Sequence, residues 1–273
     1  MTVIHPTAII EDGAEIGDDT RIGPYCVIGA DVVIGPRCVL ESHVVVQGNT
    51  TIGAECRIFP FSSIGQAPQD LKFRGENSRL RIGARTVIRE HVTVNPGTEG
   101  GGMLTEIGDD CLLMVGAHVA HDCRIGDHVI LVNNATLGGH VIVQDHAIIG
   151  GLSAVQQFSR IGRHAMVGGA SGVENDVIPF GMVTGNRARL GGLNIVGLRR
   201  RGFPREDIHA LRHAYKALFA SEEGVFNDRL ERVARDFAGN APVMEMVTFI
   251  RETLDNASSG RGLCQPARDD GGR

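Results

Sequence analysis

A six-residue spacing of aliphatic side chains constrains this chain more than any other feature. The spacing holds over residues 4–64, resumes over 82–94 and runs again over 107–173. A period of six matches neither the 3.6-residue turn of an α-helix nor the two-residue alternation of a strand. It is typical of a left-handed parallel β-helix, in which three short strands and three corners form each coil. We therefore predict an all-β, left-handed parallel β-helix prism over residues 1–190.

A second periodic position, four residues after each aliphatic one, holds small side chains. Five of the six cysteines occupy this position: Cys26, Cys38, Cys56, Cys111 and Cys123. Because the position repeats with the coil, we expect these thiols to pack in the fold rather than to form disulfides or bind metal. Cys264 lies outside the repeat, in a stretch rich in Gly, Ser, Arg and Asp, and we expect it to be exposed.

Two interruptions and a change of period divide the chain. Residues 66–81 and 95–106 are polar and rich in Gly and Pro, so we expect loops that leave the prism and build a binding surface. From about residue 191 the apolar spacing becomes helical, which predicts a small C-terminal α-helical domain over 191–256. The polar composition of residues 257–273 predicts a disordered tail.

The charge balance excludes some classes of partner. The chain has 27 basic and 32 acidic residues, a net charge of −5, which does not fit the broad positive surface of a nucleic-acid-binding protein. Residues 1–20 lack the basic start and apolar core of a signal peptide, and no apolar run reaches the length of a membrane span. We expect a cytoplasmic protein with no nucleic-acid partner and no integral membrane segment.

The stretch from His118 to Asp122 places two imidazoles and a carboxylate within an apolar sequence. In the six-residue register Val119 points into the prism, so His118 points outward and His121 lies near a corner. His140 follows His121 by one coil plus one residue, which puts their imidazoles on adjacent coils, about 5 Å apart along the axis. The sequence therefore predicts an outward-facing histidine cluster.

Three interpretations of this cluster are open. It could be a solvated surface without a role. Three imidazoles could also bind zinc and leave a position for water, although side chains three apart on an extended strand point to opposite faces. A neutral histidine oriented by Asp122 could instead act as a general base near neutral pH. We favour the general base and expect neither a metal nor a cofactor.

Six stretches together resemble a known family. They are SHVVVQGNT, QDLKF, AHVAHDC, NNATLGGHV, DHAIIGGLSAV and GLRRRGF, in this order on a hexapeptide prism with a helical tail. Over residues 4–254 the chain is similar to the bacterial UDP-N-acetylglucosamine O-acyltransferases, which catalyse the first step of lipid A biosynthesis. The resemblance implies a homotrimer with active sites between neighbouring prisms. It also implies transfer of an (R)-3-hydroxyacyl chain from acyl carrier protein to the 3-hydroxyl of UDP-N-acetylglucosamine.

The resemblance assigns roles residue by residue. His121 matches the catalytic base, with Asp122 beside it, and Gly139 matches the residue whose backbone N–H forms the oxyanion hole. Positions that match substrate-binding residues are Asp70, Lys72, His118, His140, Gln157, Asn194, Arg200 and Arg201. Met166 and Gly169 match residues that line the acyl-chain cleft, where a glycine leaves room for a longer chain.

Some positions depart from the family pattern. Gln156 and Arg187 each stand where the family carries His, and Val196 stands where it carries an acidic residue. These departures affect the expected nucleotide contacts and leave open the 3-amino analogue of the sugar as acceptor. A coenzyme A-dependent hexapeptide acyltransferase is a further alternative, although it would not need the basic run 199–201. In the family, that run would bind a pyrophosphate and attract the acidic carrier protein.

Overall fold

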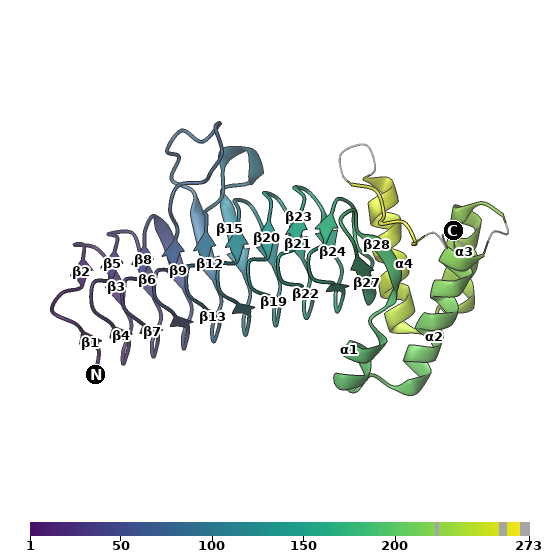
Figure 1. Ribbon diagram of the computed structural model, residues 1–273, viewed down its shortest axis with the longest axis horizontal. Coiled ribbons are helices and arrows are strands. Elements are labelled where there is room, and N and C mark those ends of the chain that lie inside the picture. The colour runs from purple at the N-terminus through teal and green to yellow at the C-terminus, as the bar shows by residue number, and fades with distance from the viewer. Residues whose placement is uncertain (222–223, 257–260, 268–273) are drawn as a thin grey trace.

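The computed structural model describes residues 1–221, 224–256 and 261–267. The chain forms a long three-sided prism with a cluster of helices at one end, and the N-terminus lies at the other end (Figure 1). Each coil adds one short strand to each of three sheets, so neighbours in a sheet are three strands apart in sequence, except at the end of the largest sheet, where β25, β27 and β28 are neighbours. This is the left-handed parallel β-helix that the six-residue period predicts.

The three sheets are named A, B and C. Sheet A contains β1 (Val3–Ile4), β4 (Arg21–Ile22), β7 (Val39–Leu40), β10 (Arg57–Ile58), β13 (Val87–Ile88), β16 (Leu112–Leu113), β19 (Ile130–Leu131), β22 (Ile148–Ile149), β25 (Met166–Val167), β27 (Gly181–Thr184) and β28 (Arg189–Leu193). Sheet B contains β2 (Ile9–Ile10), β5 (Val27–Ile28), β8 (Val45–Val46), β11 (Ser63–Ile64), β14 (Thr93–Val94), β17 (His118–Val119), β20 (Thr136–Leu137), β23 (Ala154–Val155) and β26 (Gly172–Val173). Sheet C contains β3 (Glu15–Ile16), β6 (Val33–Ile34), β9 (Asn49–Ile52), β12 (Arg79–Ile82), β15 (Leu104–Ile107), β18 (Arg124–Ile125), β21 (Ile142–Val143) and β24 (Arg160–Ile161).

The interior of the prism consists of the periodic aliphatic side chains, stacked coil on coil. Ile28, Val119 and Ile149 are fully buried, whereas Ile4 is 43% exposed because its coil lies at the open end. The five periodic cysteines are also buried, as predicted, and are free thiols. Burial raises the pKa of Cys123 to about 12, so this thiol packs as an unreactive small side chain.

The corners of the prism have a recurrent backbone conformation that the sequence did not indicate. The residue three positions after the inward aliphatic one has a positive φ even where it is not glycine, as at Asp122 (60°) and His140 (61°). This turn directs the side chain away from the core. Equivalent side chains on successive coils therefore form columns along three edges, which we call the A–B, B–C and C–A edges after the sheets that they join.

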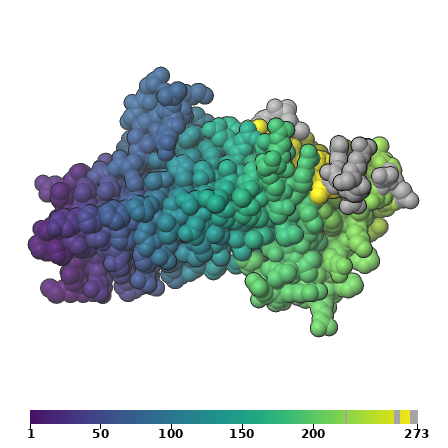
Figure 2. Space-filling model, in the orientation of Figure 1, coloured from purple at the N-terminus to yellow at the C-terminus, as the bar shows by residue number. Residues whose placement is uncertain are grey.

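Both predicted interruptions leave the prism and protrude on one side of it (Figures 1 and 2). They are shorter than predicted at their C-terminal ends, because β12 begins at Arg79 and β15 at Leu104. These four-residue strands pair in register with each other, and β12 also pairs with β9. The second excursion contains the short 3-10 helix η1 (Glu99–Gly101).

Helices follow the last coils. They are α1 (Ile195–Arg200), α2 (Arg205–Tyr215), the π-helical turn η2 (Lys216–Ala220), α3 (Phe226–Asp236) and α4 (Ala241–Asp255). Arg160 of sheet C joins α4 to the prism, since its guanidinium donates to the Phe249 carbonyl at 3.0 Å and to the buried Asp176 carboxylate at 3.0 Å.

The described part of the tail, residues 261–267, differs from the prediction. Leu263 forms a parallel bridge with Asp176, and Pro266 forms one with Leu190. Cys264 is only 2% exposed, and its thiol donates to the Ala188 carbonyl at 2.9 Å. The predictions of an exposed Cys264 and of disorder in this segment are therefore wrong, because main-chain pairing fixes it to the last strands. The rest of the predicted tail, 257–260 and 268–273, lies outside the described residues.

Candidate active site

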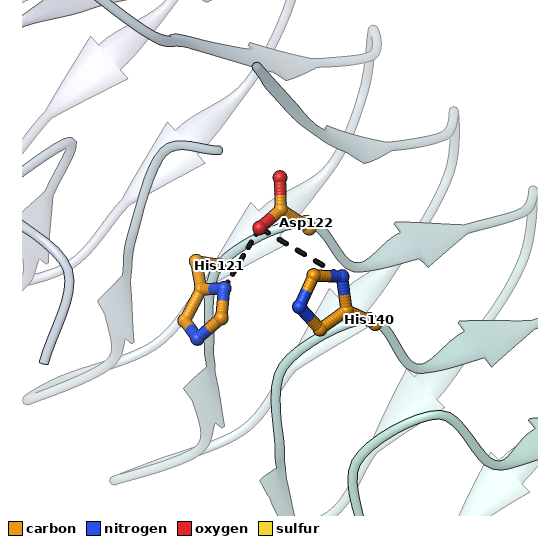
Figure 3. A group of neighbouring side chains, drawn as sticks. All are labelled: His121, Asp122 and His140. Carbon is orange, nitrogen blue, oxygen red and sulfur yellow. Dashed lines mark hydrogen bonds and ion pairs between the residues drawn. The ribbon is translucent and has the colours of Figure 1, made fainter. Parts of the chain in front are cut away.

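His121 and Asp122 lie at the B–C edge, at the corner between β17 and β18 (Figure 3). The Nδ1 atom of His121 is 2.8 Å from Oδ2 of Asp122, and the imidazole is almost fully buried. An ionised carboxylate can only accept a hydrogen bond, so Nδ1 carries the proton and Nε2 keeps a free lone pair. The corner thus holds an oriented imidazole with a basic nitrogen.

The Asp122 carboxylate is fully buried, and both of its oxygens accept hydrogen bonds. Its Oδ1 accepts from the Thr98 N–H at 2.9 Å, and its Oδ2 accepts from the Thr98 hydroxyl at 2.6 Å as well as from His121. The Asp122 N–H donates to the Thr105 hydroxyl at 2.7 Å. Sequence reasoning missed Thr98 and Thr105, since neither lies in a recognisable motif.

His140 occupies the same edge one coil further along, as the sequence predicts. Its ring centroid is 5.0 Å from that of His121 with the rings perpendicular, and its Nδ1 is 3.9 Å from Asp122 Oδ2 (Figure 3). Its other face stacks on Phe158 at 4.4 Å. Burial lowers the pKa of His140, and the Asp122 charge opposes this shift. His140 is therefore a neutral imidazole at neutral pH.

His118 lies on the outer face of sheet B, on the same coil as His121. Its Nδ1 is 2.7 Å from the Thr93 hydroxyl. Burial is the main cause that lowers the pKa of His118, and His121 adds to it. The three predicted histidines thus lie on the same part of the prism, with His118 on the sheet and the other two at the edge.

The two excursions, His140 and Phe158 line a cavity of about 470 Å³. Its lining residues are Asp70, Lys72, Phe73, Glu76, Thr98, Glu99, Gly100, His140 and Phe158. Asp70 and Lys72 both lie close enough to act electrostatically on His140. The structure therefore brings the predicted residues of the first loop to the histidine group.

Gly139 lies directly against the imidazole of His121. A Cβ atom at this position would be 2.6 Å from Cε1 and 2.7 Å from Nε2 of the ring, closer than any side chain tolerates. The absence of a side chain thus lets the backbone approach the basic nitrogen. Gln157 lies one coil further along, where its carbonyl accepts from Arg261 Nε at 3.1 Å.

Other predicted residues lie on different edges or faces of the prism. Asn194 caps α1 by accepting from the Gly197 N–H, and it donates to the His164 carbonyl at the C–A edge. Arg201 donates to the His146 carbonyl at the same edge. Arg200 is exposed in the last turn of α1, Met166 is on sheet A and Gly169 is at the A–B edge. Within one chain these residues are not brought to His121.

The three positions that depart from the family pattern form no hydrogen bond or ion pair with His121 or Asp122 among the described residues. Val196 is 60% exposed on α1, and Arg187 is an exposed residue 4.0 Å from Glu174. Gln156 precedes Gln157 and donates its N–H to the Val173 carbonyl at 2.8 Å.

His121, Asp122 and His140 could also be considered as metal ligands, since one donor atom from each lies within 4.8 Å of the others. The hydrogen bonds argue against a resident ion. Asp122 already accepts three of them, and a cation at this position would have to displace the His121 proton that Oδ2 binds. The donor set is better suited to orient an imidazole than to hold a metal.

Comparisons with known proteins identify the family. The chain is 53% identical, over 97% of its length and 99% of the relative's, to the acyl-(acyl-carrier-protein)–UDP-N-acetylglucosamine O-acyltransferase of Caulobacter vibrioides. The Paracoccus denitrificans enzyme of the same name is 56% identical over 73% of this chain and 75% of its own. This chain belongs to the UDP-N-acetylglucosamine O-acyltransferase family. It is an acyltransferase enzyme.

Two family models match separate parts of the chain, and a solved structure matches nearly all of it. A model described as UDP-N-acetylglucosamine O-acyltransferase, domain 2, matches residues 176–264, and a bacterial transferase hexapeptide model matches residues 1–30 and 104–139. The crystal structure of the UDP-N-acetylglucosamine O-acyltransferase from Moraxella catarrhalis superposes with a TM-score of 0.89 at 40% identity, over 96% of this chain and 99% of that one. Among the described helices, none has the length and apolarity to cross a membrane.

Proposed function

We propose that this acyltransferase moves an (R)-3-hydroxyacyl chain from acyl carrier protein to the 3-hydroxyl of UDP-N-acetylglucosamine, with His121 as general base. The reaction is the first step of lipid A biosynthesis and takes place in the cytoplasm. The names of the relatives supply the donor and the acceptor. The observation that carries the mechanism is the bond from His121 Nδ1 to the buried Asp122 carboxylate, because it leaves Nε2 free to take a proton.

The proposed step uses the two sides of the imidazole. Nε2 of His121 takes the proton of the sugar hydroxyl while its oxygen attacks the thioester carbonyl carbon. The Gly139 N–H stabilises the negative charge that develops on the carbonyl oxygen. When the tetrahedral intermediate collapses, the C–S bond breaks and the carrier's thiolate receives the proton from His121. Asp122 stabilises the imidazolium between these two transfers.

The cavity supplies groups that fit a charged sugar substrate. Lys72 provides a cation, and Asp70 and His140 provide hydrogen-bonding groups on the wall of the cavity. His118 lies on the same coil as the base. We assign all four to acceptor binding. Gln157, one coil beyond Gly139, extends this surface toward the helical end.

A homotrimer accounts for the predicted residues that lie on other edges. The outward side chains of sheet A in the middle of the prism are apolar and only partly exposed: Val87, Leu112, Ile130, Ile148 and Met166. Sheet C instead presents charged side chains, such as Arg81 and Arg124. A closed ring of three prisms buries apolar faces against one another. We infer that Met166, Gly169, Asn194, Arg200 and Arg201 of one protomer complete the site that contains His121 of the next.

Replacing the base tests the mechanism. We expect His121→Ala to lower kcat by about 10²–10⁴ with little change in assembly, because proton transfer by a positioned side chain contributes this much. His128→Ala is a matched control, since His128 is an exposed corner histidine of the C–A edge. Mass spectrometry of the product would follow the reaction. Full activity of His121→Ala would refute the general-base role.

The same assay distinguishes the alternatives for donor and acceptor. Carrier-linked and coenzyme A-linked acyl chains are offered in parallel, each with the 3-hydroxyl sugar and with its 3-amino analogue. We expect turnover with the carrier-linked chain and the 3-hydroxyl sugar. Faster turnover with the coenzyme A thioester would refute the proposed donor, and faster turnover with the amino sugar would refute the proposed acceptor.

Mixing two inactive variants tests the shared site. If Arg200 acts on the neighbour's site, trimers assembled from His121→Ala and Arg200→Ala chains contain some sites with both residues intact. We therefore expect activity to return after the two are unfolded together and refolded. A mixture that stays as inactive as its parents would show that one chain supplies both residues to its own site.

A further inference from the structure

The second excursion is fixed onto the catalytic pair by one residue. We propose that Thr98 is a positioning residue, which holds the Asp122 carboxylate so that it keeps the proton on Nδ1 of His121. This inference rests on the proposed general-base role of His121. Thr98 does not belong to any of the stretches that indicated the family, and it reaches the corner from 24 positions earlier in the chain.

Thr98 contacts both oxygens of the carboxylate. Its N–H donates to Oδ1 at 2.9 Å and its hydroxyl donates to Oδ2 at 2.6 Å, so the two bonds fix the plane of the carboxylate. The hydroxyl and the His121 N–H share Oδ2, which has room for both. Because Asp122 is fully buried, water cannot replace the hydroxyl without moving the loop. The orientation of the imidazole therefore depends on Thr98.

The loop around Thr98 is closed tightly enough to hold it in place. The Thr98 carbonyl accepts from the N–H groups of Gly101 and Met103, both at 3.0 Å. Gly101 lies so close to Asp122 that a Cβ on it would be 1.9 Å from the carboxyl carbon. The carboxylate is thus enclosed by the loop on one side and by the corner on the other.

The chemistry explains why such a clamp affects catalysis. A carboxylate that can rotate would offer its hydrogen bond to His121 for only part of the time. The imidazole could then turn or adopt the tautomer with the proton on Nε2, which cannot act as a base. Charge-assisted hydrogen bonds hold geometry more strongly than neutral ones. Thr98 supplies one such bond from a side chain that does not touch the reacting atoms.

The test removes only the hydroxyl. Thr98→Val keeps the shape of the side chain and the N–H bond to Oδ1. We expect kcat to fall about ten- to hundred-fold, as for the loss of a hydrogen bond to a charged group, with KM nearly unchanged. Thr98→Ser restores the hydroxyl and should restore most of kcat. Nitrogen NMR of histidine-labelled protein should show the Nδ1–H tautomer of His121 in the wild type and in Thr98→Ser, but a mixture in Thr98→Val.

A matched control separates positioning from stability. Thr20 is a buried threonine whose hydroxyl donates to the Gly35 carbonyl at 2.8 Å and accepts from the Cys38 N–H at 3.1 Å, at the far end of the prism. Thr20→Val should lower the melting temperature without changing kcat or the His121 tautomer. Wild-type kcat and tautomer in Thr98→Val, with His121→Ala inactive, would overturn the inference and leave the proposed function intact. Activity of His121→Ala would overturn the proposed function, while the tautomer measurement, which needs no substrate, would still decide the role of Thr98.

Discussion

The B–C and C–A edges of the prism both carry histidines, yet only on the C–A edge do successive histidines share the same corner position. On the C–A edge, His128, His146 and His164 stack with parallel rings at 4.6 and 4.7 Å. On the B–C edge Asp122 takes the corner position and His121 lies one residue before it. The His121 and His140 rings are perpendicular, and Asp122 accepts a hydrogen bond from His121. The backbone thus provides columns of outward side chains, and only on the B–C edge does a buried carboxylate with a loop over it orient an imidazole.

The contrast is clearest in the hydrogen bonds of His164. Its Nε2 is 3.2 Å from Nη1 of Arg163, which can only donate, so Nδ1 must carry the proton. That Nδ1 is buried and has no hydrogen-bond partner among the described residues. Burial, with the charge of Arg163 next in size, lowers the pKa of His164 to about 3. This ring therefore acts as a packing element, stacked against Phe180 and edge-on to Phe203.

The largest effect should come from removing the charge that distinguishes the two edges. We expect Asp122→Asn to lower kcat by about 10²–10⁴. The amide has one acceptor oxygen for the donors of Thr98 and His121, and its NH₂ group would favour His121 with the proton on Nε2. Steady-state rates with the carrier-linked donor measure the change. Activity close to wild type would mean that the Asp122 carboxylate does not give the histidines of the B–C edge a function that those of the C–A edge lack.

A second change acts through shape alone. Gly139→Ala would place a methyl group 2.6 Å from the His121 ring and push it away, so we expect kcat to fall about 10²-fold. Gly239→Ala is the control, because nothing lies within 4 Å of the added methyl group. Comparing the rates of the two variants separates the displacement of the His121 ring from the general effect of replacing a glycine by alanine. Equal rates for the two would show that the ring position does not matter.

The smallest effect concerns stability and tests the C–A edge. We expect His164→Phe to raise the free energy of unfolding by about 1 kcal/mol, because it removes a buried donor without a partner among the described residues. The lowered pKa of His164 also makes the stabilising effect of His164→Phe depend on pH. His164 binds a proton in the unfolded state below about pH 6.5 but in the folded state only near pH 3, so the free energy of unfolding of the wild type falls as the pH drops below about 6.5. The melting temperature of the variant should therefore exceed that of the wild type by more at about pH 5 than at about pH 7.5. A difference in melting temperature that does not change with pH would contradict the lowered pKa of His164.

Much of the fold follows from spacing, because the six-residue period determines which side chains point inward. The same register correctly placed His121 and His140 on adjacent coils and the periodic cysteines in the interior. The Thr98 contact could not be predicted, since it joins residues 24 apart through an irregular loop. Cys264 was wrongly expected to be exposed, because main-chain bridges to Asp176 and Leu190 leave no periodic signal. The predicted roles of Asn194, Arg200 and Arg201 stay predictions, since they need a second chain.

The two excursions leave the prism and rejoin it without disturbing the pairing of the coils. Arg79 aligns with Asn49 on one side and with Leu104 on the other, as though no residues had been inserted. The length and composition of the first loop could therefore change during evolution while His121, Asp122 and Gly139 kept their spacing. The second loop has less freedom, because Thr98 binds the Asp122 carboxylate. Selectivity for the acceptor could then differ among related enzymes while the proposed catalytic residues stay the same.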